Sequence, residues 1–307
     1  MNEPTQNNQD NVYVIETDSL TKVYGNKKAV NNVSVHIRRG DIYGLIGKNG
    51  AGKTTLMRLI LGLTSPTSGK IYINSSTDLY TEREKIGSII EAPGLYKSCS
   101  AYENLLRFSI LYGADKDEIP SILSLVGLEN VGKKKAGVFS QGMRQRLGIA
   151  IALLAHPDIL ILDEPINGLD PAGIKEIRDL LLKLNEEKKV TIMISSHLLD
   201  ELAKIVTVYG IIRKGELVEE ISAEELEARC GFYAKFVTSD DDKAASIIVS
   251  AYPDASVEKR ADGLYMFNDL EMTAAINALL VKSGLDVSEI AKISYGLEDF
   301  FIERLGD

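Results

Sequence analysis

The residues between 47 and 55 combine glycines, a lysine and two threonines in a spacing that suits phosphate chemistry. The run Gly47-Lys48-Asn49-Gly50-Ala51-Gly52-Lys53-Thr54-Thr55 contains the pattern G-x-x-x-x-G-K-[ST]. Glycines let the backbone bend so that several N–H groups face phosphate oxygens. Lys53 is then placed to reach the β- and γ-phosphates of a nucleotide, and the Thr54 hydroxyl to bind Mg²⁺. The alternative is a glycine-rich turn that binds no ligand.

A second group of chemical interest follows the apolar run 159–162, which ends in the carboxylates Asp163 and Glu164. A buried strand with acidic residues at its carboxyl end fits the ligand crevice of an open α/β sheet. Asp163 is expected to hold Mg²⁺ through water, and Glu164 to accept a proton from an attacking water. The alternative is a pair of carboxylates that caps a helix.

The elements around these residues alternate between strand and helix. Short apolar runs at 42–46, 86–90, 159–162 and 190–195 predict buried strands, and helical spacing is present at 54–61 and 172–188. Further strands are expected at 12–16 and 30–37. This alternation predicts an α/β domain.

The sequence changes in character near residue 221. Beyond a charged helical piece at 223–229, the expected order is strand, helix, strand, strand, helix, strand and a last helix, which predicts a small ferredoxin-like α+β module. The predicted organisation is a disordered tail at 1–11, a nucleotide-binding domain at 12–220 with a helical subdomain at about 92–156, and an accessory domain at 221–307.

Composition argues against several classes of protein, although it does not exclude a local basic site for a nucleotide. The 307 residues carry a net charge of −9, which argues against nucleic-acid binding and against broad adhesion to an anionic membrane. Cys99 and Cys230 have no metal-ligand or disulfide-framework spacing, a pattern suited to a reducing compartment. The polar N-terminus does not read as a signal peptide. The longest apolar run, 147–155, is too short to span a bilayer, so a membrane role is expected to come through a partner.

Four further motifs give the sequence a family resemblance. The run 139–146, FSQGMRQR, resembles the signature motif of ATP-binding cassette (ABC) proteins, usually L-S-G-G-Q, and the run 167–170, NGLD, resembles their D-loop. His197, after two serines, resembles their switch histidine. Tyr24 lies where the family stacks an aromatic ring on adenine. The motifs occur in the family's order from Tyr24 to His197.

The resemblance implies a P-loop ABC ATPase cassette with a mixed core sheet and a helical subdomain. It implies that Ser140 and Gly142 contact the ATP held by a second copy of the chain, so that a homodimer holds two ATP molecules between its cassettes. It further implies that His197 contacts the γ-phosphate and that Asp170 belongs to the nucleotide site. Gln141 and Met143 depart from the usual signature, whereas Ser140 and Gly142 are retained.

Glu91 is a more specific departure, because most cassettes have glutamine at the end of this strand. Glutamate here resembles the exporters that protect bacteria against bacitracin and lantibiotics, and the run 296–301, GLEDFF, resembles the tail of their cassette subunits. By resemblance, Glu91 touches Mg²⁺ and faces the membrane subunit.

The function implied is that of an ATPase subunit of a peptide or drug exporter, bound to an integral-membrane permease at the cytoplasmic face of the membrane. The alternative is a non-transport ABC ATPase with a regulatory or assembly role. A chromosome or repair ATPase would have a long coiled-coil insertion, a translation factor two cassettes, and an iron–sulfur assembly ATPase no C-terminal module. That module is interpreted as structural or dimer-supporting, with a ligand-binding regulatory role as its alternative.

Overall fold

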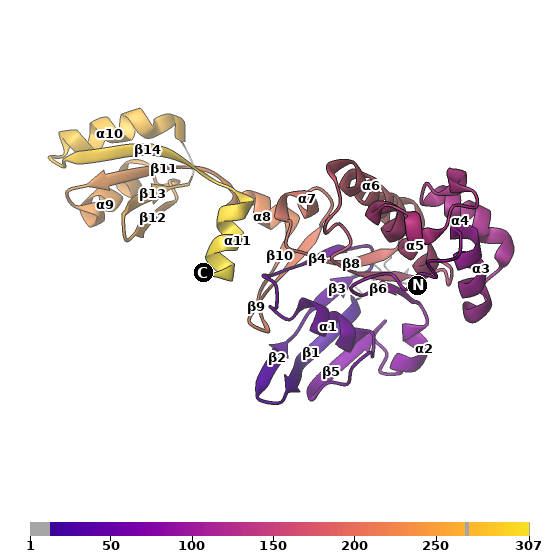
Figure 1. Cartoon of the computed structure of the whole chain (residues 1–307). Coiled ribbons are helices and arrows are strands. Elements are labelled where there is room, and N and C mark those ends of the chain that lie inside the picture. The colour runs from indigo at the N-terminus through magenta and orange to yellow at the C-terminus, as the bar shows by residue number, and fades with distance from the viewer. Residues whose placement is uncertain (1–12, 268–269, 307) are drawn as a thin grey trace, which may run out of the picture. The chain divides into compact units, whose positions relative to one another are not determined.

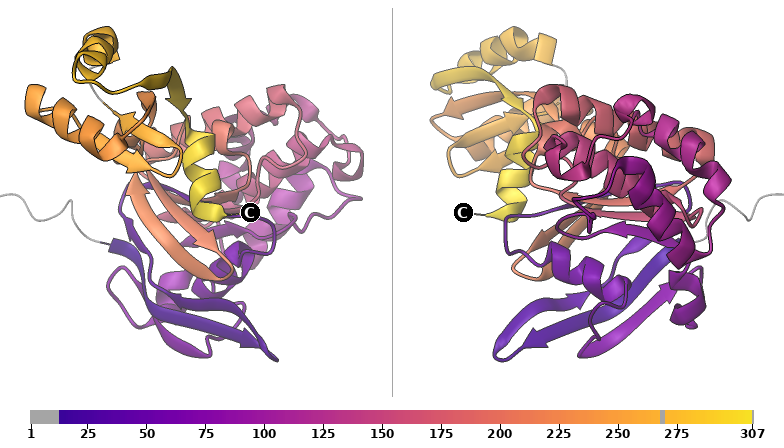
Figure 2. Two further views of the ribbon diagram at one scale, coloured as in Figure 1. Left: turned by 90° about the vertical axis from the view of Figure 1, so that its left-hand side faces the viewer. Right: turned by 45° about the vertical axis from the view of Figure 1, so that its right-hand side comes forward.

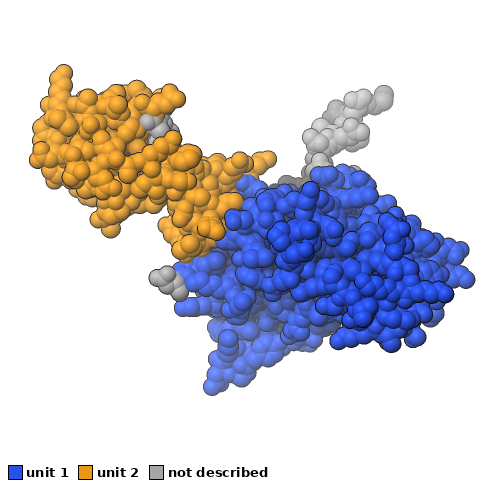
Figure 3. Space-filling model, turned by 45° about the horizontal axis from the view of Figure 1, so that its top comes forward, with its two compact units in different colours: residues 1–223, 304–307 blue, residues 224–303 orange. Residues whose placement is uncertain are grey.

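The computed structural model describes residues 13–267 and 270–306 of the chain (Figure 1). The predicted tail at 1–11 lies outside the described residues. The chain divides into two compact units, which Figure 3 colours separately. The first contains residues 1–223 and 304–307, and the second contains residues 224–303.

One layer of the first unit is an antiparallel sheet in which β1 is central. Its strands are β1 (Tyr13–Tyr24), β2 (Lys27–Val33), β3 (His36–Arg38) and β5 (Ser68–Ile73). The prediction of a single strand at 30–37 was wrong, because the chain leaves β2 after Val33 and enters β3 at His36. Residue Asn32 has a φ of +54°, which breaks regular extended geometry at the end of β2.

The second layer is a six-stranded sheet in the order β10-β9-β4-β8-β7-β6. All neighbours are parallel except β10 and β9, so the sheet is mixed. This confirms the predicted α/β cassette with a mixed core sheet. The strands are β4 (Ile42–Ile46), β6 (Ile86–Ile89), β7 (Ile159–Asp163), β8 (Thr191–Ser196), β9 (Val208–Arg213) and β10 (Glu216–Ser222).

Helix α1 (Lys53–Ile60) lies between these two sheets, as Figure 1 shows. Its apolar residues Leu56, Met57 and Leu59 are fully buried and belong to one core cluster with residues of β1, β2, β5, β7 and β8. The short loop between β4 and α1 is therefore fixed at both ends by buried elements. This is the loop in which the sequence predicts a phosphate site.

Most helices of this unit lie on the other side of the six-stranded sheet, as Figure 2 shows, whereas α2 (Leu79–Arg83) lies beside β5 of the antiparallel sheet. The helices of this unit are α2 (Leu79–Arg83), α3 (Ala101–Tyr112), α4 (Ile119–Leu125), α5 (Gln141–Leu153), α6 (Pro171–Lys188) and α7 (Leu199–Leu202), with 3-10 turns at Lys116–Glu118, Glu129–Val131 and Ala136–Val138. Helices α3 to α5 lie within the predicted helical subdomain at 92–156. Among the described residues, no helix has the length and apolar character needed to cross a membrane.

The second unit has the element order of the ferredoxin-like motif. Strands β11 (Gly231–Thr238), β12 (Val257–Arg260), β13 (Gly263–Met266) and β14 (Val287–Tyr295) form an antiparallel sheet in the order β12-β13-β11-β14. Helices α9 (Asp241–Ala251) and α10 (Thr273–Lys282) share an apolar core with that sheet. The remaining elements are α8 (Ala223–Arg229), a 3-10 turn at Leu270–Met272, and α11 (Leu297–Leu305).

Candidate nucleotide site

The loop between β4 and α1 has a backbone that only glycine adopts readily. Gly50 and Gly52 have φ values of +79° and +114°, in the left-handed region. A Cβ on Gly52 would lie 2.5 Å from the carbonyl oxygen of Ala29, and one on Gly47 would lie 2.5 Å from that of Ile212. Nothing lies within 4 Å of a Cβ on Gly50, so the backbone there is open. The loop is thus packed tightly on its inner side and accessible on its outer side.

Helix α1 offers its N-terminal end to this open side. Its N-cap is Gly52, which has no side-chain hydrogen bond, and its first turn contains no acidic residue. The free N–H groups and the helix dipole favour an anion at this end. The helix begins at Lys53, whose side chain is 6% exposed and whose Nζ donates to the Gly47 carbonyl oxygen at 2.6 Å.

Thr54 meets the carboxyl end of β7. Its Oγ1 donates to Oδ2 of Asp163 at 2.7 Å, and Ser195 Oγ donates to Oδ1 of the same carboxylate at 2.6 Å. Asp163 and Ser195 are buried, at 3% and 0% exposure. Both aspartate oxygens are therefore fixed, and a hydroxyl and a carboxylate face each other at the start of α1.

Glu164 lies between Lys53 and His197. One carboxylate oxygen, Oε1, is 3.3 Å from Lys53 Nζ, and the other, Oε2, is 2.8 Å from His197 Nδ1. Oε1 is buried and has no hydrogen-bond partner. The Glu164 backbone has a φ of +51°, and its N–H donates to Ser195 Oγ at 3.0 Å. Such strained backbone clusters at functional sites.

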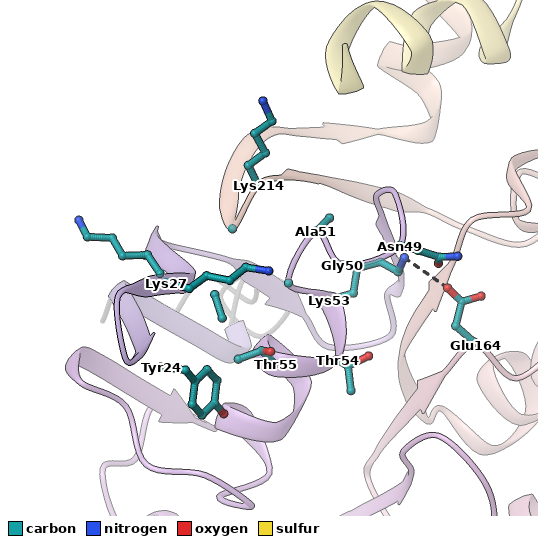
Figure 4. A pocket seen from close by; sticks show the side chains of 14 residues that line it. Tyr24, Lys27, Asn49, Gly50, Ala51, Lys53, Thr54, Thr55, Glu164 and Lys214 are labelled. Atoms are coloured by element: carbon teal, nitrogen blue, oxygen red, sulfur yellow. Dashed lines mark ion pairs between the residues drawn. The ribbon is translucent and has the colours of Figure 1, made fainter. Parts of the chain in front are cut away.

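Lys53, Thr54 and Glu164 border a cavity of about 470 Å³, whereas Asp163 and His197 lie behind its lining (Figure 4). Figure 4 shows Lys53 directed toward Glu164, with Tyr24 and Lys27 at the far end of the cavity from Glu164. The lining includes Tyr24, Asn49, Gly50, Ala51, Gly52, Lys53, Thr54, Thr55 and Glu164, all predicted as site residues. The structure therefore brings the aromatic ring, the loop and the carboxylate to one cavity.

The cavity also has basic residues that the sequence reasoning missed. Lys27 and Lys28 come from the start of β2, and Lys214 comes from the turn between β9 and β10. With Lys53 they give the lining four lysines against one carboxylate, a charge balance that suits a polyphosphate. Lys27 and Lys28 follow Tyr24 closely in the sequence, and this proximity could have identified them as residues of the same site. No local pattern marks Lys214.

Tyr24, the last residue of β1, keeps 49% of its surface exposed. Lys22 Nζ lies 4.9 Å from the centre of its ring, within the range of a cation–π contact. A half-exposed ring at the edge of the cavity presents a surface on which a planar base can stack.

Ser140, Gly142 and Asp170 do not line this cavity. Ser140 caps α5 by accepting from Met143 N–H, and Asp170 caps α6 by accepting from Gly173 N–H at 3.1 Å. A Cβ on Gly142 would lie 3.9 Å from Leu169. The signature and D-loop segments therefore lie beside each other within the chain, apart from its own phosphate loop.

Gln141, which departs from the usual signature, connects these two segments. Its Nε2 donates to the Asn167 carbonyl oxygen at 2.8 Å. Gly168 has a φ of +71°, and a Cβ there would approach Gln141 Nε2 to 2.9 Å. The larger side chain at 141 is therefore accommodated by the turn at 167–168.

Glu91, the third predicted metal ligand, follows β6 and points elsewhere. Its Oε1 accepts from Arg58 Nη2 at 2.5 Å, and its side chain is 67% exposed. It does not line the cavity described above. Arg58, on α1, is a further charged residue that the sequence reasoning missed.

The fold and the cavity together define a class of protein. A phosphate-binding loop at the end of the central strand β4, a carboxylate pair at the carboxyl end of β7, two strands away in the same sheet, and a basic cavity of this size are the parts of a P-loop nucleotide-binding ATPase.

Comparison with known proteins agrees and is more specific. A family model described as ABC transporter matches residues 30–167. The chain is similar to the bacitracin transport ATP-binding protein BcrA of Bacillus licheniformis, with 44% identity over 95% of this chain and 97% of BcrA. It is also similar to the lantibiotic transport ATP-binding protein SrtF of Streptococcus pyogenes, with 44% identity over 67% of this chain and 90% of SrtF. The chain belongs to the ABC transporter family and is an ABC ATPase that binds ATP.

Solved structures of cassettes share the fold. The dimeric cassette MJ0796, described in a post-hydrolysis state bound to ADP and Pi, has 28% identity and a TM-score of 0.62, over 68% of this chain and 98% of that one. CbiO1 of Clostridium perfringens, part of the ABC transporter complex CbiONQ, has 26% identity and a TM-score of 0.65, over 79% of this chain and 96% of that one.

Proposed function

We propose that this chain is the ATP-hydrolysing subunit of an exporter that moves antimicrobial peptides of the bacitracin or lantibiotic type through a separate membrane permease. The observation that supports hydrolysis is Glu164, held between Lys53 and His197 at the edge of a basic cavity. The relatives named for bacitracin and lantibiotic transport support the class of cargo.

ATP is held, in this proposal, by the loop, the start of α1 and the lysines around the cavity. The N–H groups of residues 47–55 bind phosphate oxygens, and Lys53 neutralises the charge of the β- and γ-phosphates. Its present partners, the Gly47 carbonyl and Glu164, are contacts that Lys53 can exchange for phosphate. Tyr24 stacks on the base.

The residues around Thr54 fit a Mg²⁺ ion. Thr54 Oγ1 and Asp163 Oδ2 face each other at 2.7 Å at the start of α1, and both are the hard oxygen donors that Mg²⁺ prefers. Thr54 would bind the ion directly, Asp163 through water, and Glu91 would complete the set. When bound, Mg²⁺ neutralises charge on the phosphates during phosphoryl transfer.

Glu164 acts as the general base for the attacking water. Its Oε1 is buried, makes no hydrogen bond and pairs with Lys53 Nζ at 3.3 Å, so it can accept a proton once Lys53 has moved to the phosphates. His197 positions the carboxylate through Oε2 and contacts the γ-phosphate. Ser195 fixes the Glu164 backbone and the Asp163 side chain together, so the base and the metal ligand keep a constant spacing.

Two copies of the chain form the active unit. Ser140 and Gly142 lie at the start of α5 and away from the chain's own phosphate loop, so they are available to the ATP of a second copy, with Asp170 beside them. The dimeric cassette structure among the relatives supports this arrangement. The dimer works at the cytoplasmic face of the membrane, bound to the permease, and nucleic acid is not a partner.

Transport can be tested in a bacterium that is sensitive to bacitracin and nisin. We expect co-expression of the chain with a candidate permease from the same genome to raise the inhibitory concentration of one of these peptides, and the Glu164→Gln variant to abolish the gain. An antibiotic that is not a peptide serves as the control. Strong ATPase activity of the purified chain without any gain in resistance would favour the regulatory or assembly role instead.

We further propose that the ABC domain spans 12–220 and the accessory domain 221–307. The apolar core that contains α1 uses residues up to Leu217, whereas the core around β11 uses residues 234–287. Every residue that lines the nucleotide cavity precedes Glu216. The two regions are therefore expected to fold separately.

A fragment that ends at Ala223 tests this boundary. We expect it to fold cooperatively and to be stabilised by Mg-ATP as the full chain is, measured by thermal unfolding. The truncation removes the peripheral bonds of Arg304 to Glu219 and of Lys48 to Gly306. Aggregation of the fragment, or a fragment that folds without binding ATP, would show that the boundary divides one folding unit.

A further inference from the structure

Glu91 occupies the apex of a tight turn that follows β6. The N–H of Ala92 donates to the carbonyl oxygen of Ile90 at 3.0 Å, which closes a three-residue turn around Glu91. The Glu91 backbone has a φ of +67°. A γ-turn with positive φ is rare and strained, and non-glycine residues in this region cluster at functional sites.

Packed elements hold the turn on both sides. Before it, Ile89 pairs with Leu162 of the neighbouring strand β7. After it, Pro93 lies so close to α5 that a Cβ on Gly148 would approach the Pro93 Cβ to 2.5 Å. The Glu91 side chain itself is 67% exposed. The backbone is therefore fixed and the carboxylate is the part that can change partners.

Its present partner is Arg58, one turn after Thr54 on α1. Residues four apart lie on the same face of a helix, so Arg58 and Thr54 share the face that Glu91 approaches. The ion pair is short, at 2.5 Å, but its side chains are 39% and 67% exposed. Exposed pairs contribute little free energy, so this one can open without a large penalty.

We propose that Arg58 is a positioning residue for Glu91: it binds the carboxylate in the nucleotide-free cassette and keeps that charge one helical turn away from the γ-phosphate and the metal. An ionised glutamate beside an incoming polyphosphate repels it, whereas the glutamine usual in the family does not. Arg58 supplies the compensating cation within the chain. The carboxylate leaves Arg58 when Mg²⁺ is present to offset its charge.

This inference rests on the proposed ATP and Mg²⁺ site, and a double-mutant cycle tests it. The variants are Arg58→Ala, Glu91→Gln and the two combined. The readout is the Kd for ATP, measured by equilibrium binding of a fluorescent ATP analogue, once in EDTA and once in excess Mg²⁺. Thermal unfolding without nucleotide reports any loss of stability in α1.

In EDTA, we expect Arg58→Ala to weaken ATP binding about two- to fivefold more in the Glu91 protein than in the Glu91→Gln background, the range that exposed ion pairs give. Excess Mg²⁺ should reduce this difference. The Kd in EDTA divided by the Kd in Mg²⁺ should therefore be larger for Arg58→Ala than for the wild-type chain. Arg58→Lys, which retains the charge, should restore most of the affinity. Arg39→Ala is the control, because it removes one positive charge elsewhere in the unit. It should leave the ratio of the Kd in EDTA to the Kd in Mg²⁺ unchanged.

Equal effects of Arg58→Ala in both backgrounds would overturn the proposal, because Arg58 would then attract phosphate or stabilise α1 independently of Glu91. Failure of the proposed nucleotide site would give a different result: the wild-type chain and Lys53→Ala would bind the analogue equally. The two failures are therefore distinguishable in one series of measurements.

Discussion

Glu164→Gln is expected to lower the ATPase rate by about 10²–10⁴-fold, the range that general acid–base groups contribute, while ATP still binds. The amide retains the size of the side chain but cannot accept a proton from water at neutral pH. Substitution also removes the negative charge that lies 3.3 Å from Lys53 Nζ, so ATP affinity should be equal or higher. The measurements are the steady-state rate of phosphate release and the Kd for ATP.

The same variant should accumulate as an ATP-bound dimer, because hydrolysis no longer separates the two copies. Size-exclusion chromatography with light scattering, with and without Mg-ATP, reports the mass. Glu82→Gln is the matched control, since Glu82 pairs with Lys85 and does not line the cavity. An unchanged ATPase rate together with a monomer in ATP would contradict both the base and the dimer.

The phosphate loop could be predicted because it is contiguous. The motif between residues 47 and 54 determines the backbone path almost alone, and buried runs on either side identify β4 and α1. Asp163 was predictable for the same reason. A wholly apolar strand that ends in a carboxylate indicates a ligand site at the carboxyl ends of the strands. The local sequence pattern was therefore sufficient to predict those site residues whose positions depend on the backbone of one short segment.

The rest of the cavity depends on contacts between distant segments. The turn with Lys214 reaches the loop because the Gly215 N–H donates to the Ala51 carbonyl oxygen at 2.8 Å, and Asn31 N–H donates to the Gly215 carbonyl oxygen at 2.7 Å. No spacing in the sequence encodes this arrangement. Arg58 was missed for a similar reason: its partner is set by the strained turn at Glu91, which sequence periodicity does not reveal.

The full length of β1 could not be predicted from the sequence either. The sequence predicts a strand only at 12–16, whereas β1 continues to Tyr24. Irregularities in its pairing with β2, between Leu20 and Val23, and a φ of +51° at Ser19 shift the inward and outward faces. The alternation on which strand prediction depends is therefore interrupted, although the strand continues and delivers Tyr24 to the cavity.

Lys53→Ala is expected to weaken ATP binding about ten- to a hundredfold, because charge-assisted hydrogen bonds contribute about 1.5–3 kcal/mol. Lys53 is the lysine that the loop itself places at the β- and γ-phosphates, and its side chain is 6% exposed, so water replaces the lost charge poorly. Thermal unfolding measures the effect. ATP at a hundredfold excess over Kd stabilises the native state by about 2.7 kcal/mol, and a hundredfold weaker Kd reduces this to about 0.4 kcal/mol.

Two controls separate this loss from general effects of charge or folding. Lys214→Ala removes a lysine from the same cavity but outside the loop, and it should weaken ATP binding much less than Lys53→Ala. Unfolding without nucleotide shows what loss of the bond from Lys53 Nζ to the Gly47 carbonyl does to the loop itself. If Mg-ATP raises the unfolding temperature of Lys53→Ala as much as that of the wild-type chain, the phosphates bind elsewhere and the assignment of this loop is wrong.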